Sequence, residues 1–221
     1  MDHVIDKVNM SELSESEEQA REYDEVARTI FSPIYPVIAR QILKRTGIAN
    51  GTCLDVGSGP AHLAIALADH SDLMVFAMDK SPSMCRIGHT NVEHHRQERR
   101  VKPVLGDVHS IPFDDNSMDL VVSRGSVFFW NDLTQAFSEC KRVLRPGGKA
   151  FIGGGFGSAD LRKEISLRML ERDPDWDEKR KGWFGRCDTD TIRDALVGAA
   201  IVEPDVVRDD SGFWIYFLKE G

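Results

Sequence analysis

A glycine-rich turn between an apolar segment and a helix-like segment constrains the fold more than any other feature of the chain. Residues 52–56 are apolar apart from Thr52 and Asp55, residues 57–60 read Gly-Ser-Gly-Pro, and residues 61–68 have helical spacing of leucine, isoleucine and alanine. Glycines at a strand-to-helix turn allow positive φ angles and let a ligand approach the backbone. The pattern therefore predicts a ligand-binding loop that follows a strand.

Two acids follow at the ends of further strand-like segments. Asp79 closes residues 73–79, and Asp107 follows residues 101–105. Because parallel strands end at one edge of a sheet, the loop and both acids are expected at the same crevice. Asp79 lies 22 residues after Gly57, a spacing that also suits the ribose acid of a dinucleotide-binding fold, so the distance alone leaves the ligand open.

Three positions disfavour a dinucleotide and hence a nicotinamide-dependent oxidoreductase. Ala61 stands where the dinucleotide loop has its third glycine. Asp55 lies inside the end of its strand, where a carboxylate repels a pyrophosphate and attracts an ammonium group. Asp107 is placed to accept a hydrogen bond from an adenine amino group. A ligand that combines adenosine with a cationic end fits these residues better.

These motifs together resemble the class I S-adenosylmethionine-dependent methyltransferases of the small-molecule type. The resemblance runs from Tyr23 to Ile152, with a weaker echo at residues 213–218, and it includes the segments 118–123 and 142–148. It implies S-adenosyl-L-methionine as cofactor and S-adenosyl-L-homocysteine as product. The positions that match cofactor-binding residues of the family are Tyr23, Asp55, Gly57, Ser58, Gly59, Asp79, Lys80, Met84, Gly106, Asp107, Val108, Ser123 and Arg124.

The sequence offers no clear general base. Many relatives carry a histidine pair before a tryptophan where this chain has Phe128, Phe129 and Trp130. We expect this aromatic segment, with Gly154 and Gly155 after the fifth strand, to contact the substrate. Tyr23 and Arg124 are candidates for positioning the reactants, with core packing and a surface salt bridge as their alternatives. For His62 and His109, cofactor packing or a surface position is favoured over catalysis.

Alternation of strand-like and helix-like segments predicts a doubly wound, Rossmann-like, mostly parallel seven-stranded sheet with helices on both faces. The last two strands are close enough in sequence to form an antiparallel hairpin at the edge. The expected strands are residues 52–56, 73–79, 101–105, 118–123, 149–153, 200–207 and 213–219, and the expected helices after the N-terminal region are 60–69, 82–96, 131–144 and 158–171.

The chain is expected to divide into an N-terminal helical lid, residues 1–46, and a cofactor-binding domain, residues 47–221. Residues 154–190 are expected to form an insert that caps the substrate. Within the lid, residues 1–12 are polar and expected to be loose. Ser14 and Glu17 resemble a capping box at the start of a helix, Pro33 and Pro36 are expected to break it, and a second helix is expected over residues 35–45.

Composition limits the partners. The 221 residues include 28 basic and 36 acidic side chains, for a net charge of −8, and no basic stripe suggests nucleic acid. The four cysteines have no metal-ligand spacing, so no metal is expected, and free thiols suggest a reducing compartment. With no long apolar run, we expect no membrane contact, a cytoplasmic location, and a monomer or homodimer.

The function predicted from these observations is direct displacement of a methyl group onto a small-molecule acceptor. A sensor or accessory protein that binds S-adenosylmethionine without turnover is the alternative, supported by the missing base. A basic peptide as acceptor stays open as well, because an acidic surface can receive one. The accepting atom is not readable from local spacing.

Overall fold

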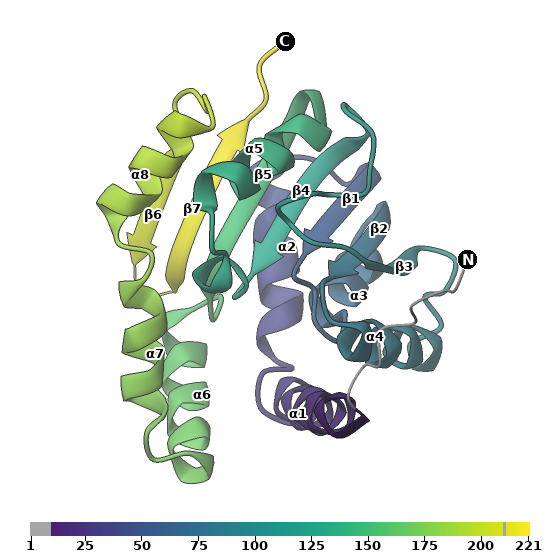
Figure 1. Ribbon diagram of the computed structural model, residues 1–221, viewed down its shortest axis with the longest axis vertical. Coiled ribbons are helices and arrows are strands. Elements are labelled where there is room, and N and C mark those ends of the chain that lie inside the picture. The colour runs from purple at the N-terminus through teal and green to yellow at the C-terminus, as the bar shows by residue number, and fades with distance from the viewer. Residues whose placement is uncertain (1–9, 210) are drawn as a thin grey trace, which may run out of the picture.

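The computed structural model describes residues 10–209 and 211–221, and these form a seven-stranded sheet between helices (Figure 1). The strand order is β3-β2-β1-β4-β5-β7-β6. The strands are β1 (Asn50–Val56), β2 (Asp72–Asp79), β3 (Val101–Leu105), β4 (Met118–Arg124), β5 (Leu144–Gly155), β6 (Asp205–Asp209) and β7 (Gly212–Leu218). Strands β1 to β5 pair in parallel, whereas β7 runs antiparallel to both β5 and β6. The predicted fold class and its antiparallel edge are confirmed.

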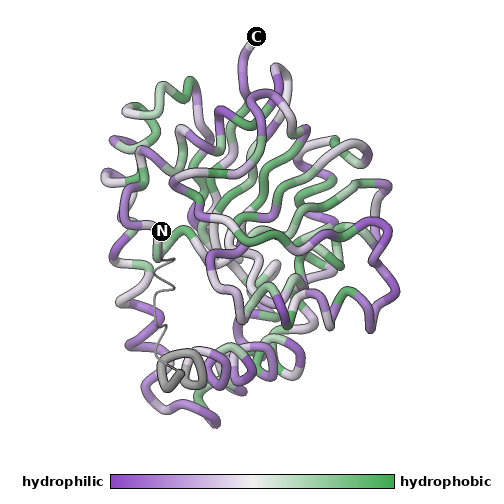
Figure 2. Tube along the Cα trace, turned by 45° about the vertical axis from the view of Figure 1, so that its right-hand side comes forward, coloured by the Kyte–Doolittle hydropathy of each residue, from purple (hydrophilic) through white to green (hydrophobic). Residues whose placement is uncertain are grey.

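Successive side chains of the central strand β1 enter two separate apolar layers. Cys53 packs with α2 (Ile34–Thr46) and α3 (His62–Asp69), and Leu54 packs with α5 (Leu133–Val143) and α8 (Thr189–Gly198). Such alternation follows from the two-residue period of a strand. In Figure 2 the strands form a hydrophobic centre between more polar helices. Burial on both faces explains why β1 and β4 read as nearly continuous apolar runs.

The strand order reverses between β1 and β4. From β1 the chain first builds outward through β2 and β3, and it then returns to place β4 on the other side of β1. In open α/β sheets, ligands bind beside the carboxyl ends of the strands at such a switch point. The turn after β1 lies at this point, so the topology places the ligand loop of the sequence where a crevice is expected.

The N-terminal region differs in detail from the expectation. Helix α1 (Met10–Thr29) begins before Ser14, so Ser14 is not its N-terminal cap. Pro33 does separate the two helices, but Pro36 lies in the first turn of α2. Proline is tolerated there because the first N–H groups of a helix have no intrahelical partner. Residues 1–9, expected to be loose, lie outside the described residues.

Four segments beyond β4 also differ. Strand β5 begins at Leu144, before the expected glycine turn, because the β4–β5 pairing has an irregularity that takes the turn into the strand. Strand β6 begins only at Asp205, since Pro204 has no N–H to donate and Glu203 has a positive φ of 47°. Helix α4 (Pro82–His94) and helix α6 (Ala159–Arg172) were expected, whereas α7 (Trp176–Gly185) and α8 were not.

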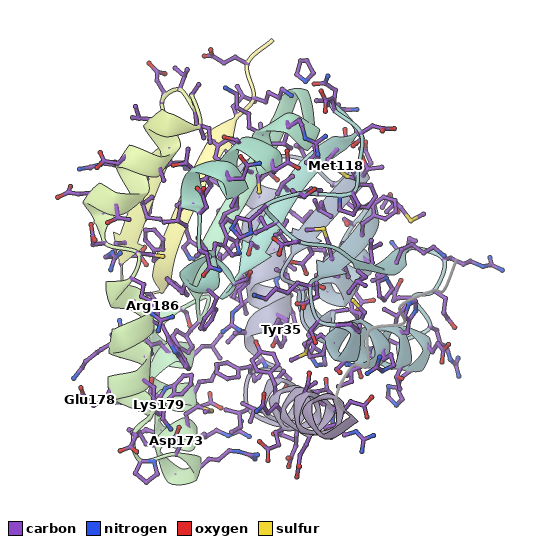
Figure 3. The ribbon with its side chains drawn as sticks, in the orientation of Figure 1. Tyr35, Met118, Asp173, Glu178, Lys179 and Arg186 are labelled. Atoms are coloured by element: carbon purple, nitrogen blue, oxygen red, sulfur yellow. The ribbon has the colours of Figure 1, made fainter. Side chains whose placement is uncertain are left out.

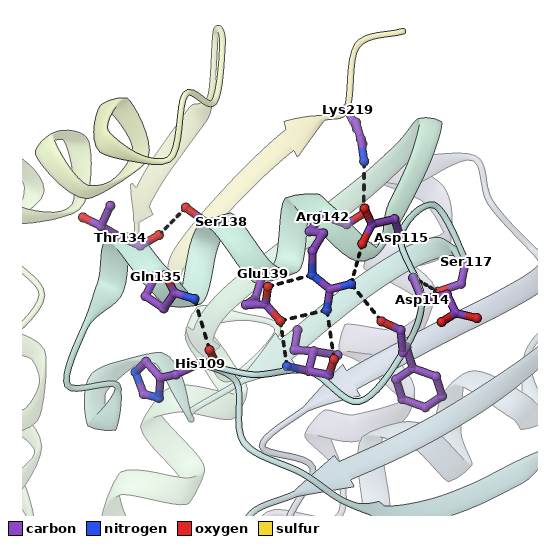
Figure 4. Close-up of polar contacts among 12 residues, drawn as sticks. His109, Asp114, Asp115, Ser117, Thr134, Gln135, Ser138, Glu139, Arg142 and Lys219 are labelled. Carbon is purple, nitrogen blue, oxygen red and sulfur yellow. Dashed lines mark hydrogen bonds and ion pairs between the residues drawn. The ribbon is translucent and has the colours of Figure 1, made fainter.

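Arg142 of α5 fixes the loop that joins β3 to β4 (Figure 4). Its guanidinium donates to the carbonyl oxygens of Ile111 and Phe113, both at 2.9 Å, and to the carboxylates of Glu139 and Asp115. Glu139 in turn accepts from the Ile111 N–H at 2.8 Å, and Arg142 lowers the pKa of Glu139. The same loop begins with Gly106 and Asp107, so this network anchors a segment of the candidate site.

Replacing Arg142 with methionine is expected to lower the free energy of unfolding by about 2–3 kcal/mol. The variant leaves Glu139 and two loop carbonyl oxygens without their donor. Urea unfolding at neutral pH measures the change. An Arg193→Met variant is the control, since Arg193 lies 4.0 Å from its partner in an exposed pair and should matter by less than about 0.5 kcal/mol. Equal losses in the two variants would contradict the anchoring role.

Candidate functional site

The turn after β1 adopts the backbone that the sequence predicted. Gly57 and Gly59 have φ angles of 66° and 53°. A Cβ added at Gly57 would lie 2.0 Å from Ser126 Oγ, so no other residue fits without displacing the turn after β4. Ala61 caps α3 with a φ of 67°, the left-handed conformation that glycine favours, at a cost of about 1 kcal/mol. The alanine therefore keeps the geometry of the expected third glycine.

Asp79 ties two loops together at the end of β2. One carboxylate oxygen accepts from the Gly59 N–H at 2.8 Å, and the other accepts from the Ser81 N–H at 2.9 Å. A carboxylate offers about four lone-pair directions, so this side chain can still accept hydrogen bonds from a ligand. Asp79 thus shapes the glycine loop and faces the crevice at the same time.

Asp55 is a buried acid without a full set of partners. It is 1% exposed, and its Oδ2 atom has no hydrogen-bond partner. Burial, followed by the nearby Asp79 carboxylate, raises the pKa of Asp55 to about 7, against a weaker effect of the Ala64 N–H. The side chain lines a small cavity of about 20 Å³ beside Tyr23 and Ser58. A buried, unpartnered carboxylate oxygen suits a ligand cation.

Asp107 is held by the residue two positions on. The N–H of His109 donates to Asp107 Oδ1 at 2.8 Å and lowers the pKa of the acid, and His109 Nδ1 lies 2.6 Å from the same oxygen. His109 Nε2 lies 3.2 Å from the Asp132 N–H, which donates to it. With both ring nitrogens engaged, His109 is a positioning group for the loop. Asp107 keeps its second oxygen for a ligand.

A cavity of about 320 Å³ runs across the ends of β1, β2 and β4. Ten of the expected cofactor positions line it: Tyr23, Gly57, Gly59, Asp79, Lys80, Met84, Gly106, Asp107, Val108 and Arg124. Asp55 and Ser58 line the small adjoining cavity, and Ser123 is buried in β4 and lines neither. The structure thus gathers positions separated by more than a hundred residues at one edge of the sheet.

A second large cavity, of about 510 Å³, lies between α1 and the α6–α7 pair, which project beyond the sheet in Figure 1. Its lining includes four of the five residues that were expected to contact the substrate: Phe128, Phe129, Gly154 and Gly155. The fifth, Trp130, lines the first cavity. We call the cavity of Asp79 the cofactor cavity and this one the apolar cavity. They share four lining residues: Tyr23, Arg124, Gly125 and Phe129.

Tyr23 and Arg124 lie at the junction of the two cavities. Each also lines the small cavity of Asp55. The Tyr23 ring covers the glycine loop, since a Cβ at Gly59 would lie 3.5 Å from it. Arg124 donates from Nε to the Gly155 carbonyl oxygen at 3.3 Å, and its guanidinium lies 5.0 Å from the centre of the Phe31 ring. Both side chains are therefore placed to touch a cofactor and an acceptor together.

His62 is committed to the interface between α1 and α3. Its Nε2 lies 2.9 Å from Asp24 Oδ1, and its ring stacks on Tyr35 at 5.3 Å. Figure 3 shows Tyr35 between the sheet and α1. The described lining of the apolar cavity includes no histidine. We expected cofactor packing or a surface position for His62, whereas the structure packs its ring against Asp24 and Tyr35.

Sequence reasoning missed part of both cavities. Gly125, Ser126 and Asn131 line the cofactor cavity but are not among the positions expected from the sequence. The positive φ of Gly125, 82°, follows from a glycine directly after an apolar strand, which was a readable signal. The aromatic side chains of α7 gave no such signal, since they reach the site only through the packing of α7 beside α6 and residues 127–129.

The methyltransferase domain family matches residues 54–152. A crystal structure from Methanococcus maripaludis, assigned as an S-adenosyl-L-methionine-dependent methyltransferase, is 43% identical, with a TM-score of 0.89 over 93% of this chain and 94% of that one. The chain belongs to the class I S-adenosylmethionine-dependent methyltransferases. The expected family and its cofactor, S-adenosyl-L-methionine, are confirmed.

Curated relatives share the domain but not one activity. The chain is 35% identical over 123 residues to a mitochondrial arginine-hydroxylase, NDUFAF5, of Danio rerio, and 32% identical over 132 residues to demethylmenaquinone methyltransferase of Staphylococcus aureus. It covers 36% and 54% of these relatives, so it spans about half of their length or less. Membership of the family therefore leaves the acceptor of this methyltransferase open.

The residues at the cofactor cavity fit S-adenosylmethionine. Gly57 and Gly59 line the cavity without side chains, so a ligand can approach their backbone, and the unpartnered Asp55 oxygen suits an ammonium group. Asp79 has lone pairs left for ribose hydroxyls, and Asp107 has one oxygen left for an adenine amino group. Within the described parts of the chain, no group of three side chains could hold a metal ion.

Proposed function

We propose that this methyltransferase transfers the methyl group of S-adenosylmethionine to a small molecule bound in the apolar cavity. The observation that carries the proposal is the junction at Tyr23, Arg124, Gly125 and Phe129, where the cofactor cavity and the apolar cavity share their walls. A cavity of about 510 Å³ has the size of small-molecule sites. The net charge of −8 argues against nucleic acid as acceptor.

The side chains around the cofactor cavity divide the binding work. In this proposal Asp55 holds the ammonium group and Asp79 the ribose hydroxyls, while Asp107, Met84 and Val108 enclose the adenine. The backbone of Gly57, Ser58 and Gly59 lies along the ligand. Lys80 and Gly106 line the same cavity, and Ser123 is buried in β4. When bound, S-adenosylmethionine supplies an electrophilic methyl on a sulfonium group.

The residues at the junction align the reactants. Tyr23 covers the glycine loop, Arg124 is fixed by Gly155 and Phe31, and Phe129 borders both cavities. Holding the nucleophile in line with the methyl–sulfur bond and excluding water are the two contributions that positioning can make. With no histidine in the described lining of the apolar cavity, the acceptor is proposed to arrive as a competent nucleophile or to lose its proton to water.

The domain arrangement proposed from the sequence gives this site its cover. The N-terminal helices of residues 1–46 supply Tyr23 and Phe31, and residues 154–190 supply the α6–α7 pair on the opposite side of the apolar cavity. The remaining partner expectations, a monomer or homodimer and a cytoplasmic location, are kept as proposals. No helix in residues 10–209 and 211–221 is long and apolar enough to cross a membrane.

The test is methyl transfer from isotope-labelled S-adenosylmethionine. The purified protein is incubated with a cell extract separated into small molecules, protein and nucleic acid, and the label is followed by mass spectrometry. We expect the labelled methyl group on a small molecule other than S-adenosylmethionine, together with S-adenosylhomocysteine. Label only in protein would support a peptide acceptor instead, and cofactor binding without any product would favour a sensor. A Tyr23→Ala variant, with the lid open, should slow the transfer by about tenfold or more.

A further inference from the structure

One face of α7 forms a wall of the apolar cavity. Trp176, Arg180, Trp183 and Phe184 follow one another at intervals of four, three and one residues, and all four line the cavity. Residues at this spacing share a face of a helix. By contrast, Glu178 and Lys179, on other faces of the helix, are exposed, and Glu178 lies at the outer edge of the molecule in Figure 3. The cavity wall therefore includes an arginine among aromatic rings.

Two N–H donors on this wall have no acceptor. Trp176 Nε1 and Arg180 Nε are buried and lack a hydrogen-bond partner. The Trp176 residue is only 9% exposed, so its indole cannot turn to water. An unpaired buried donor costs about 1–3 kcal/mol, and such groups in native proteins call for an explanation. A ligand with an acceptor oxygen at this end of the cavity would satisfy both donors.

The charges around the cavity favour an anion over a cation. Two acids line the cavity, Glu22 and Asp173, and Asp173 is already paired, since Lys179 Nζ lies 2.7 Å from its carboxylate. Of the three arginines in the lining, Arg172 lies 3.4 Å from Glu25, which leaves Arg124 and Arg180. Arg180 has its nearest acidic oxygen, on Asp177, at 3.5 Å, and its side chain is 19% exposed. Arg124 also lines the cavity, where it meets the cofactor cavity. Aromatic walls alone could hold a cation, but two guanidinium groups facing the same space repel one.

Aromatic rings form much of the remaining lining. Phe31, Phe156 and Trp176 form one ring cluster, with centroid separations of 6.3 Å and 6.0 Å from Phe31. Phe128 and Phe184 form another, with centroids 4.5 Å apart. Between these clusters, the body of a ligand would exchange water for aromatic surface.

We propose that the acceptor is an apolar, ring-sized carboxylate. Its carboxylate accepts from Arg180 Nε and Trp176 Nε1, its body lies between the two ring clusters, and its nucleophilic atom lies at the Tyr23 and Arg124 junction. This inference rests on the proposed function, because it names the substrate class of the same site. It assigns Arg180 and Trp176 to substrate recognition, at the end of the cavity away from the methyl group.

Isothermal titration with matched naphthyl compounds tests the charge preference. The protein is first saturated with S-adenosylhomocysteine, and 1-naphthylacetate, 1-naphthylacetamide and 2-(1-naphthyl)ethylamine are titrated separately. We expect the carboxylate to bind at least about tenfold more tightly than the amine, which corresponds to 1.4 kcal/mol, with the amide between them. An amine that binds as tightly as the carboxylate, or a carboxylate that does not bind, would overturn the proposal.

Variants of α7 locate the carboxylate. Arg180→Gln is expected to weaken 1-naphthylacetate binding by about tenfold, and Trp176→Phe by about threefold. Arg186→Gln is the matched control, because Arg186 is an exposed arginine at the end of the same helix and does not line the cavity. Its affinity should equal that of the unaltered protein. Equal binding by the Arg180→Gln variant would refute the assignment.

Measuring S-adenosylhomocysteine affinity in every variant separates the two proposals. Arg180 does not line the cofactor cavity, so its replacement should leave this affinity unchanged. Selective carboxylate binding with no methylated small molecule would contradict the proposed function and leave the anion site intact. Methylation of small amines, with no binding of 1-naphthylacetate, would support the proposed function and contradict the carboxylate site.

Discussion

An Asp79→Ala variant is expected to bind S-adenosylmethionine at least about 100-fold more weakly than the unaltered protein. In the proposed complex the carboxylate accepts from two ribose hydroxyls, and charged hydrogen bonds of this kind are worth about 1.5–3 kcal/mol each. The same oxygens accept from the Gly59 and Ser81 N–H groups. Removing them loosens the glycine loop as well as the ribose contact. Isothermal titration at pH 8 measures the loss.

Asp72 provides the control on the same strand. It lies at the opposite end of β2 and is exposed, so Asp72→Ala should leave the affinity unchanged. Thermal unfolding of both variants shows whether the fold survives. Affinity retained in a folded Asp79→Ala protein would mean that the acid serves only the loop, and the role carried over from the family would then be wrong for this chain.

The parts of the fold that depend on local pattern were predictable. Strand β3 begins and ends as expected, at Val101 and Leu105, because a helix end precedes it and a glycine follows it. The antiparallel edge followed from two strands too close in sequence for a crossover connection. Helix α8 was also readable, although it was not predicted: Asp188 caps it and Ile192 and Leu196 have helical spacing.

The site divides in the same way. Asp55, Asp79 and Asp107 each stand at the end of a strand, so parallel pairing alone brings them to one edge. The cavity wall formed by α7 could not be predicted in this way. Trp176 and Arg180 belong to a highly charged segment, and only the packing of α7 beside Phe31 and η1 (Val127–Phe129) turns one face inward. The spacing of these residues marks one face of a helix, but the contact that turns this face toward the cavity is tertiary and cannot be read from the spacing.

The titration of Asp55 gives cofactor binding a pH dependence. Its pKa of about 7 in the cofactor-free protein, against an ordinary value near 4, means that folding alone favours the protonated acid. The protonated acid therefore contributes stability below about pH 4, and this contribution is lost as the pH rises through about 7. A cofactor ammonium reverses the preference, because it stabilises the carboxylate. Binding below pH 7 must then release a proton.

The expected result is an affinity for S-adenosylmethionine that rises by up to about tenfold per pH unit below pH 7 and levels off above it. Titrations at pH 6, in two buffers with different ionisation enthalpies, should show the release of close to one proton per cofactor. An Asp55→Asn variant should bind weakly and almost independently of pH, since no carboxylate remains to titrate. If the unaltered protein binds equally well from pH 5 to pH 8, then Asp55 does not hold the ammonium group, and its unpartnered oxygen needs another explanation.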